Sequence, residues 1–241
     1  MSKGEVALVT GANKGIGRAI AERLVELGMT VYASARERAR GEPVASEIRA
    51  RFVHLDVTDD ATIALAAQRI GEEVGRLDLL VNNAGINLDP APPSQTSVDS
   101  LRRVYETNVF GVVAVTNAML PLLRRSGAGR VVNLSSELGS LHHQLAQDHP
   151  AGAFPNLLAY NSSKTALNAI TVAYANELRE EGIRVNAVSP GLVATDLNGH
   201  RGPLTPEQGA RMPVLVATDA NDQPTATFRG EDWTEGRTIP W

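Results

Sequence analysis

Short, almost continuously apolar runs alternate along this chain with segments of helical spacing, and this alternation restricts the fold more than any other feature. The first apolar run, Glu5–Thr10, is typical of a strand buried on both faces of a sheet. Over Ile16–Gly28, apolar residues recur at intervals of three and four, which predicts a helix. Strands and helices alternating at this spacing favour an α/β fold, with a doubly wound parallel sheet covered by helices on both faces.

The chain continues this pattern as far as residue 188. Apolar runs predict further strands at 30–34, 51–55, 79–82, 130–134 and 184–188, and helical spacing predicts further helices at 42–51, 61–74, 98–123 and 160–181. Turn residues dominate from 189 onward and leave that segment unassigned. Because no linker or shift in composition divides the sequence, we expect a single domain over residues 1–241.

Composition and charge exclude several classes of function. The 23 basic and 27 acidic residues give a net charge of −4, which argues against nucleic-acid binding and against attachment to an anionic membrane. The chain has no cysteine, which excludes disulfides, thiolate catalysis and zinc fingers. The polar N-terminus shows no secretory signal, and the longest apolar-rich stretch, Val109–Leu123, is too short to span a membrane. We therefore expect a cytoplasmic protein.

A glycine-rich turn joins the first strand to the first helix. It reads Thr-Gly-Ala-Asn-Lys-Gly-Ile-Gly over residues 10–17, and its spacing is G-x-x-x-G-x-G rather than the generic G-x-G-x-x-G. Glycines let the backbone approach a pyrophosphate, and a helix N-terminus offers free N–H groups to it. A glycine-rich turn without a ligand is the alternative. The strand before it and the helix after it favour a dinucleotide site on a Rossmann-type sheet.

Four further polar motifs fall after strands or at a helix start. They are Asn82–Gly85, Asn133–Ser136, Tyr160–Lys164 and Ser189–Gly191. In open α/β sheets, ligands bind at the edge formed by the carboxyl ends of the strands. We therefore expect these motifs to meet at one site.

In this order the motifs resemble the short-chain dehydrogenases/reductases: T-G-x-x-x-G-x-G, then N-N-A-G, a Ser before Y-x-x-x-K, and P-G. The resemblance runs from Val6 to about Leu197. The glycine-rich turn with Ala35-Arg36, and the ending Ile239-Pro240-Trp241, look most like the carbonyl-reductase-type members. The resemblance implies a dinucleotide-binding catalytic domain that acts on a small carbonyl or alcohol substrate.

The resemblance implies a catalytic set of Asn108, Ser136, Tyr160 and Lys164. Hydride transfer to a carbonyl carbon leaves an alkoxide that needs a proton, and a free tyrosine has a pKa of about 10. An ammonium four residues further along the same helix face would lower the pKa of Tyr160 towards working pH. In the family the lysine also holds the nicotinamide ribose, the serine donates to the substrate oxygen, and the asparagine holds a water that relays protons.

Two alternatives stay open within this set. Ser135 competes with Ser136, although the family pattern S-S-x-x-G favours the second serine. Asn108 can instead be a bridging polar group inside a helix.

The choice of nicotinamide depends on the end of the second predicted strand. Residues 32–36 contain no acid that would bind a ribose 2′-hydroxyl. They do contain Arg36, and Lys14 lies inside the glycine-rich turn. Two cations suit a 2′-phosphate, so we expect NADP(H). The alternative is that both are solvated surface charges.

The resemblance assigns further cofactor contacts along the same edge. An aspartate and a valine would contact the adenine, the N-N-A-G motif would line the adenosine ribose, and the residues after P-G would bracket the nicotinamide. The expected cofactor-binding residues are Gly11, Asn13, Lys14, Gly15, Ile16, Gly17, Arg36, Asp56, Val57, Asn83, Ala84, Gly85, Tyr160, Lys164, Pro190, Gly191, Val193 and Thr195.

Two segments depart from many members of the family. An insertion at 141–158 should lie over the substrate pocket; its three histidines have no metal-ligand spacing, so we expect a polar loop and no metal. The segment 199–241 should lie on the substrate side, with Trp233 or Trp241 at the mouth of the site or packed on a late strand. We expect a monomer, or a homo-oligomer paired through the two long helices, since the insertion can block that pairing.

The sequence therefore predicts an NADPH-dependent reductase of a ketone or aldehyde, with Tyr160 as acid and base. One alternative is an NAD(P)-dependent alcohol dehydrogenase that works oxidatively. The other is a non-catalytic protein that senses the cofactor on the same fold. Glu137 either steers a polar substrate or faces solvent, and the substrate itself stays open.

Overall fold

An eight-stranded sheet forms the centre of the computed structural model, which describes residues 4–88, 90–146, 157–219, 224–230 and 237–241. The strand order is β3-β2-β1-β4-β5-β6-β7-β8, and every neighbouring pair is parallel except β7 with β8. The strands are β1 Val6–Val9, β2 Thr30–Ala35, β3 Arg51–His54, β4 Leu79–Asn82, β5 Arg130–Leu134, β6 Arg184–Ser189, β7 Phe228–Gly230 and β8 Arg237–Thr238.

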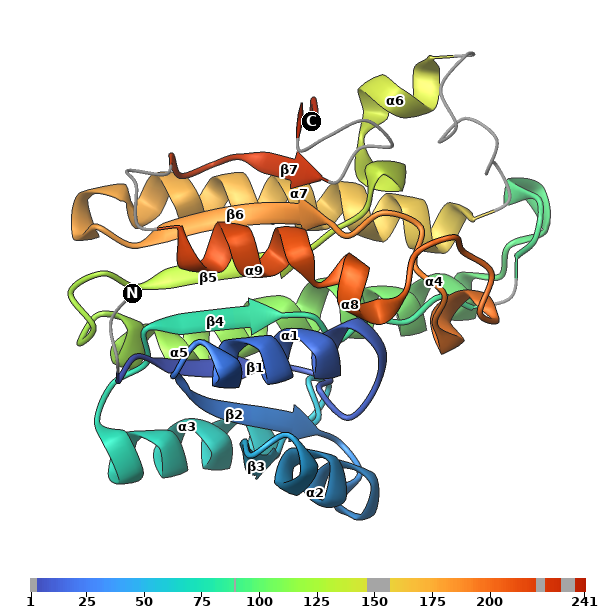
Figure 1. The fold of residues 1–241 in the computed structure, drawn as a ribbon. Helices are drawn as coiled ribbons and strands as arrows, with labels where there is room; N and C mark the ends of the chain where they lie inside the picture. The colour runs from blue at the N-terminus through green and yellow to red at the C-terminus, as the bar shows by residue number, and fades with distance from the viewer. Residues whose placement is uncertain (1–3, 89, 147–156, 220–223, 231–236) are drawn as a thin grey trace.

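Helices cover both faces of this sheet (Figure 1). On one face lie α1 Gly15–Glu26, α2 Arg38–Glu47 and α9 Arg211–Thr218, and on the other lie α3 Asp60–Val74, α5 Gly111–Leu123 and α7 Leu158–Glu177. The predicted doubly wound Rossmann-type sheet in a single domain is therefore confirmed. Strand order reverses between β1 and β4, which is the point where such sheets bind ligands at their carboxyl ends.

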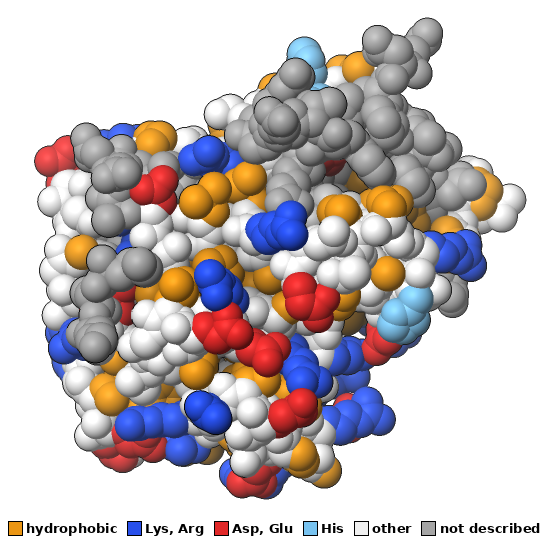
Figure 2. All heavy atoms as spheres, viewed as in Figure 1, with side chains coloured by type: hydrophobic (Ala, Val, Ile, Leu, Met, Phe, Trp, Pro, Cys, Tyr) orange, Lys and Arg blue, Asp and Glu red, His pale blue; other side chains and the backbone are white. Residues whose placement is uncertain are grey.

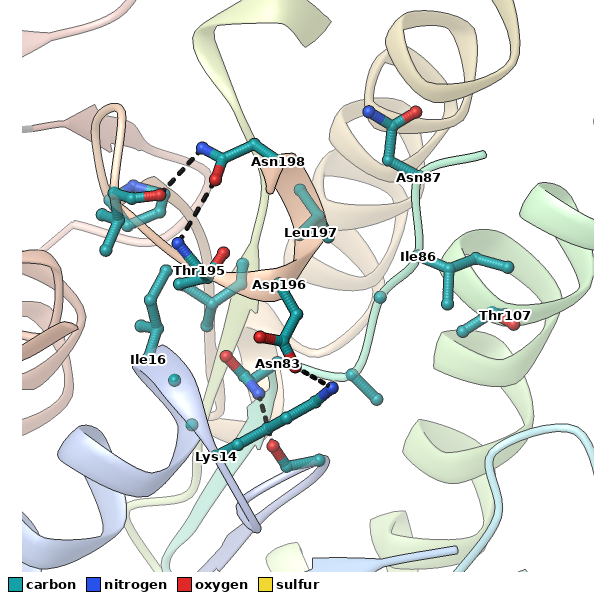
Figure 3. Close-up of a pocket in the computed structure, with 18 of the residues that line it drawn as sticks. Lys14, Ile16, Asn83, Ile86, Asn87, Thr107, Thr195, Asp196, Leu197 and Asn198 are labelled. Atoms are coloured by element: carbon teal, nitrogen blue, oxygen red, sulfur yellow. Dashed lines mark hydrogen bonds and ion pairs between the residues drawn. The ribbon is translucent and has the colours of Figure 1, made fainter. Parts of the chain in front are cut away.

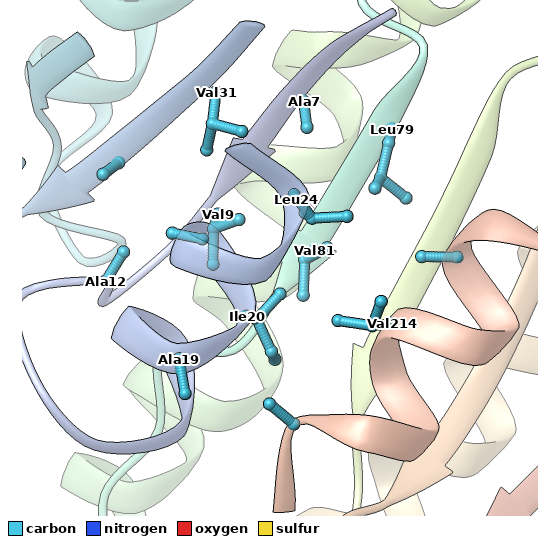
Figure 4. Packing of buried hydrophobic residues seen from close by; sticks show 14 of the residues in the cluster. Ala7, Val9, Ala12, Ala19, Ile20, Leu24, Val31, Leu79, Val81 and Val214 are labelled. Atoms are coloured by element: carbon cyan, nitrogen blue, oxygen red, sulfur yellow. The ribbon is translucent and has the colours of Figure 1, made fainter. Parts of the chain in front are cut away.

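The core consists of two apolar layers, one on each side of the sheet. Successive residues of a strand point to opposite faces, so Ala7 and Val9 join the layer under α1, and Val6 and Leu8 join the layer under α3. Figure 4 shows side chains of α1 packed against strand residues, and these are almost inaccessible to solvent. Burying one such side chain contributes about 1.5–3 kcal/mol, so both faces anchor the strands.

The predicted helix 98–123 is divided into three parts. These are α4 Val98–Tyr105, a π-helical turn η2 Glu106–Phe110, and α5. A π turn inserts one extra residue into a helix, often at a functional site, and here it places Asn108 inside the fold. By length and mean hydropathy alone, Val98–Leu123 is the one membrane-span candidate in the described part of the chain, but more than half of it is buried against other elements. We therefore treat it as a core helix.

The bounds of other elements also differ from the predicted ones. The second helix covers Arg38–Glu47 rather than 42–51. Its Gly41 lies so close to Phe52 that no side chain would fit between them. Helix α7 begins at Leu158 and ends at Glu177, where a 3-10 turn takes over. The unassigned C-terminal segment forms α8 Pro206–Gly209, α9, β7 and β8.

The surface carries mixed charge. Figure 2 shows basic and acidic side chains interspersed over the face drawn, without a broad field of one sign. This distribution offers no continuous basic stripe on that face for a nucleic-acid backbone.

Candidate active site

A cleft of about 1070 Å³ opens at the carboxyl ends of the parallel strands. The residues that line it come from the glycine-rich turn (residues 10–17), the ends of β2 to β6, the start of α7, and the loop after β6 (residues 190–205, the β6 loop). Every predicted cofactor-binding residue lines this cleft, and so do Ser136, Tyr160 and Lys164. Asn108 is the one predicted site residue that does not line it.

The glycine-rich turn is fixed to the segment after β4. The Thr10 hydroxyl accepts hydrogen bonds from the backbone N–H groups of Asn83 and Ala84, at 2.9 and 3.0 Å. The Asn83 side chain donates to the Thr10 carbonyl at 2.8 Å. A Cβ on Gly17 would lie 2.3 Å from the Asn83 Nδ2 atom, so only glycine fits there. The Asn83 amide thus holds the turn in place, in addition to lining the cleft.

The backbone of the glycine-rich turn has a conformation that suits the binding of a dinucleotide. Gly11 and Gly15 have φ of +63° and +55°, a region that favours glycine. The free N–H groups at the start of α1 follow directly, and Lys14 occupies the position just before the helix without capping it. This arrangement leaves donors available to a pyrophosphate.

Three side chains meet deep in the cleft. Ser136 hydrogen-bonds with Tyr160, and the Lys164 ammonium lies 5.5 Å from the centre of the Tyr160 ring. The Lys164 Nζ atom donates to the carbonyl of Leu134, at the end of β5, at 2.7 Å. Ser135 instead donates to the Asn168 side chain at 2.6 Å. Of the two serines, Ser136 is therefore the one that lies beside Tyr160.

Burial controls the protonation of this group. Desolvation raises the pKa of Tyr160 to about 12, and the hydrogen bond from Ser136 offsets only part of that rise. Desolvation lowers the pKa of Lys164 to about 8. The expected lowering of the Tyr160 pKa towards working pH is therefore wrong for this structure, because loss of water around the phenol outweighs the hydrogen bond from Ser136.

Asn108 lies behind the wall of the cleft. Its side chain accepts from the Ile86 backbone N–H at 2.8 Å and donates to the Ile86 carbonyl at 2.9 Å and to Ser163 at 3.1 Å. The side chain is fully buried and both of its donor hydrogens have partners. In this structure the amide therefore works as a bridging group that fixes Ile86, a residue that lines the cleft.

Charged residues line the part of the cleft that follows β2. Arg36 is largely exposed and lies 3.7 Å from the Glu37 carboxylate, which also pairs with Arg40 at 3.0 Å. Both Glu37 and Arg40 line the cleft, although neither was predicted as a site residue. A signal for both was their position, since each stands within four residues of Arg36. The Asp56 carboxylate accepts two hydrogen bonds from Thr58 and thus shapes its own turn.

The β6 loop forms the facing wall and is held mainly by bonds within itself. Asn198 donates to the carbonyls of Val193 and Arg201 at 2.9 and 2.7 Å and accepts from the Thr195 backbone. Figure 3 shows Lys14 extending from the start of α1 towards Asp196 of this loop. The Lys14 ammonium and the Asp196 carboxylate are 2.5 Å apart.

The C-terminal residues pack against the segment after β5 and against β7. The buried Ser140 hydroxyl donates to the Pro240 carbonyl at 2.6 Å and caps the short helix α6 Leu141–Leu145. Trp241 stacks on Phe228 with ring centres 5.6 Å apart, so it packs on a late strand rather than filling the cleft. Much of the predicted insertion, including His149 and Phe154, lies outside the described residues. Of its described part, Leu157 lines the cleft.

The family model described as short chain dehydrogenase matches residues 5–203. This chain belongs to the short-chain dehydrogenases. It is 37% identical, over 227 residues, to the short-chain dehydrogenase anuI of Penicillium roqueforti, covering 90% of this chain and 89% of that protein. As a short-chain dehydrogenase it is a nicotinamide-dependent oxidoreductase of CH–OH and C=O groups, which confirms the broader part of the predicted function.

Solved structures of other short-chain dehydrogenases share the fold. The NADPH-bound carbonyl reductase from chicken fatty liver is 29% identical with a TM-score of 0.86, and the match covers 100% of both chains. The 3-ketoacyl-(acyl-carrier-protein) reductase of Brucella melitensis, complexed with NADH, is 27% identical with a TM-score of 0.85, covering 95% of this chain and 97% of that one. The predicted likeness to carbonyl reductases is therefore confirmed.

Proposed function

We propose that this short-chain dehydrogenase reduces a ketone or aldehyde to an alcohol with NADPH as the hydride donor. The observation that carries the proposal is the convergence of Ser136, Tyr160 and Lys164 in one cleft with a glycine-rich turn. The full-length likeness to the NADPH-bound carbonyl reductase supports the direction of the reaction. The reaction is reversible, and we assign it to the cytoplasm.

When bound, the cofactor supplies a hydride to the carbonyl carbon. Tyr160 then donates its phenolic proton to the substrate oxygen, and Ser136 donates a hydrogen bond to the same oxygen. A Tyr160 pKa of about 12 keeps the phenol protonated at neutral pH, so its proton is available to the substrate alkoxide, which is the stronger base. Lys164, oriented by the Leu134 carbonyl, stabilises the phenolate that remains and binds the ribose beside it.

Exposed cations support NADPH. Arg36 and Arg40 line the adenosine end of the cleft, and Lys14 projects from the glycine-rich turn. A guanidinium binds a 2′-phosphate through paired hydrogen bonds, which a 2′-hydroxyl cannot make. We assign the discrimination between the cofactors mainly to Arg36 and Arg40.

A second candidate is oxidation of an alcohol with NAD. The observation in its favour is Glu37, whose carboxylate lines the cleft beside Arg36 and could accept a hydrogen bond from a ribose 2′-hydroxyl. Fluorescence titration with NADPH and NADH separates the two candidates. Tighter binding of NADPH supports the reductase, tighter binding of NADH favours the oxidative candidate, and binding of neither would favour the non-catalytic alternative.

The catalytic roles are tested by replacing one hydroxyl. We expect Tyr160→Phe to lower kcat for carbonyl reduction at least about a hundredfold, because the acid that protonates the alkoxide is lost. Its affinity for NADPH should stay close to that of the wild type. Tyr174→Phe is the matched control: this tyrosine lies on the same helix and its hydroxyl bonds to Asn117, outside the cleft. Wild-type turnover in Tyr160→Phe would overturn the assignment.

A further inference from the structure

Lys14 has an anionic partner in this structure that would compete with a bound cofactor. The Lys14 ammonium lies 2.5 Å from Asp196 Oδ2, and the other carboxylate oxygen of Asp196 lies 2.8 Å from the His200 imidazole. Both ends of the Lys14–Asp196 pair are more than half exposed. The two residues are 182 positions apart in the sequence and belong to opposite walls of the cleft.

The backbone presents Asp196 to Lys14. Thr195 and Asn198 form a capping box around the 3-10 turn η6 Asp196–Asn198, which fixes the first residue of that turn. The Thr195 methyl group lies against Gly15, where a Cβ would approach it to 3.4 Å. The glycine-rich turn and the β6 loop therefore touch beside this ion pair, and the pair bridges the two walls.

A lysine is a single point charge, so the same ammonium cannot make its best contact with two anions at once. Lys14 and His200 lower the pKa of Asp196, in that order of importance, and the carboxylate therefore stays charged at neutral pH. A 2′-phosphate that takes Lys14 as a partner must first draw it away from Asp196. NADH carries no phosphate there and does not compete for the ammonium in this way.

We propose that Asp196 is a specificity-determining residue, which weakens the preference for NADP(H) over NAD(H) by holding Lys14 across the cleft. This inference rests on the proposed function only in taking a nicotinamide dinucleotide as the ligand. Exposed ion pairs contribute modestly, so the effect of Asp196 on affinity should be about two- to fivefold. The guanidinium groups of Arg36 and Arg40 set the larger part of the preference, and Asp196 tunes it.

The test is a double-mutant cycle on dissociation constants for NADPH and NADH. Asp196→Asn should tighten NADPH binding by about two- to fivefold more than it tightens NADH binding. In the Lys14→Ala background, the same substitution should change both affinities equally. Glu207→Gln is the matched control, because it removes an exposed carboxylate at the start of α8 that does not line the cleft.

Two outcomes overturn the proposal. One is that Asp196→Asn changes the affinities for NADPH and NADH by the same factor, as Glu207→Gln should. The other is that its selective effect persists without Lys14. The ratio of affinities in the wild type tests the proposed cofactor separately, since the shift caused by Asp196→Asn is expected from either starting ratio. Binding of neither dinucleotide by the wild type would remove both proposals.

Discussion

The two walls of the cleft are held in different ways. Hydrogen bonds from the segment after β4 fix the glycine-rich turn, and its helix α1 packs its apolar side into the core. The β6 loop is ordered mostly by Asn198, which binds the loop's own backbone, and it meets the other wall through an exposed ion pair. A segment packed into the core opens only when much of the core unfolds, so its opening free energy is high. A loop held by local bonds has a low opening free energy. The structure thus pairs a glycine-rich wall that is fixed to the core with a loop wall that is held by its own bonds.

The largest effect is expected at Lys164, whose ammonium is buried in α7, between the two walls in the sequence. Its pKa is about 8 in the folded protein against an ordinary value near 10.5, so the unfolded chain binds more protons between those limits. Burial of the charge therefore destabilises the fold fully below pH 8, and this penalty disappears as the pH rises to 10.5. Relative to Lys164→Met, the wild type should gain about 3 kcal/mol of stability across that window.

Urea unfolding of both proteins at pH 7.5, 8.5, 9.5 and 10.5 measures this difference, because effects of other groups on stability cancel between them. A difference that stays constant over the window would contradict a desolvated ammonium at this position.

Gly17→Ala should be the next largest change. The added methyl group would meet Asn83 Nδ2 at 2.3 Å and the Gly11 carbonyl at 2.5 Å, so the fixed wall has to shift. We expect a loss of about 2–3 kcal/mol in stability and loss of NADPH binding. Gly71→Ala is the control, a helical glycine whose new Cβ would come no closer than 3.5 Å to its neighbour. It should leave stability equal or higher, since alanine favours helix. Equal thermal midpoints for the two variants would count against a fixed wall.

A matched pair of asparagines makes the smallest and most direct comparison. Asn83 donates to two backbone carbonyls of the glycine-rich turn, and Asn198 donates to two backbone carbonyls of the β6 loop. Asn83→Ala should cost about 1–2 kcal/mol of global stability, because it leaves carbonyls of the turn without partners. Asn198→Ala should leave global unfolding nearly unchanged while hydrogen exchange in the β6 loop speeds up. If the two variants lose the same global stability, the contrast between the walls fails.

The sheet was predictable because its signal is local. Runs such as Glu5–Thr10 are apolar on both faces, and this needs no knowledge of the partners of each strand. Strands β7 and β8 have three and two residues, too few to show a period, and they exist because β6 offers them an edge. The π turn at Asn108 is equally invisible in the sequence, since the amide gains its partners from Ile86 on another segment.

In the candidate site, too, features with a local signal were predictable and features that depend on distant partners were not. Glycine spacing and the polar motifs at strand ends indicated which residues would line the cleft, because the carboxyl ends of parallel strands converge. The protonation of Tyr160 could not be read in that way. Its dominant cause is loss of water, which depends on burial by distant parts of the chain, whereas the spacing to Lys164 reports only a neighbour on the helix. Lys14 likewise showed its charge in the sequence but not its partner.

The bond from Ser140 to Pro240 has a consequence for synthesis. Ser140 caps α6 shortly after the end of β5, yet its acceptor lies 100 residues further along the chain. Since synthesis runs from the N-terminus, the strands β1 to β6 exist before this bond can form, and we expect the segment around Ser140 to take its final place after the parallel sheet.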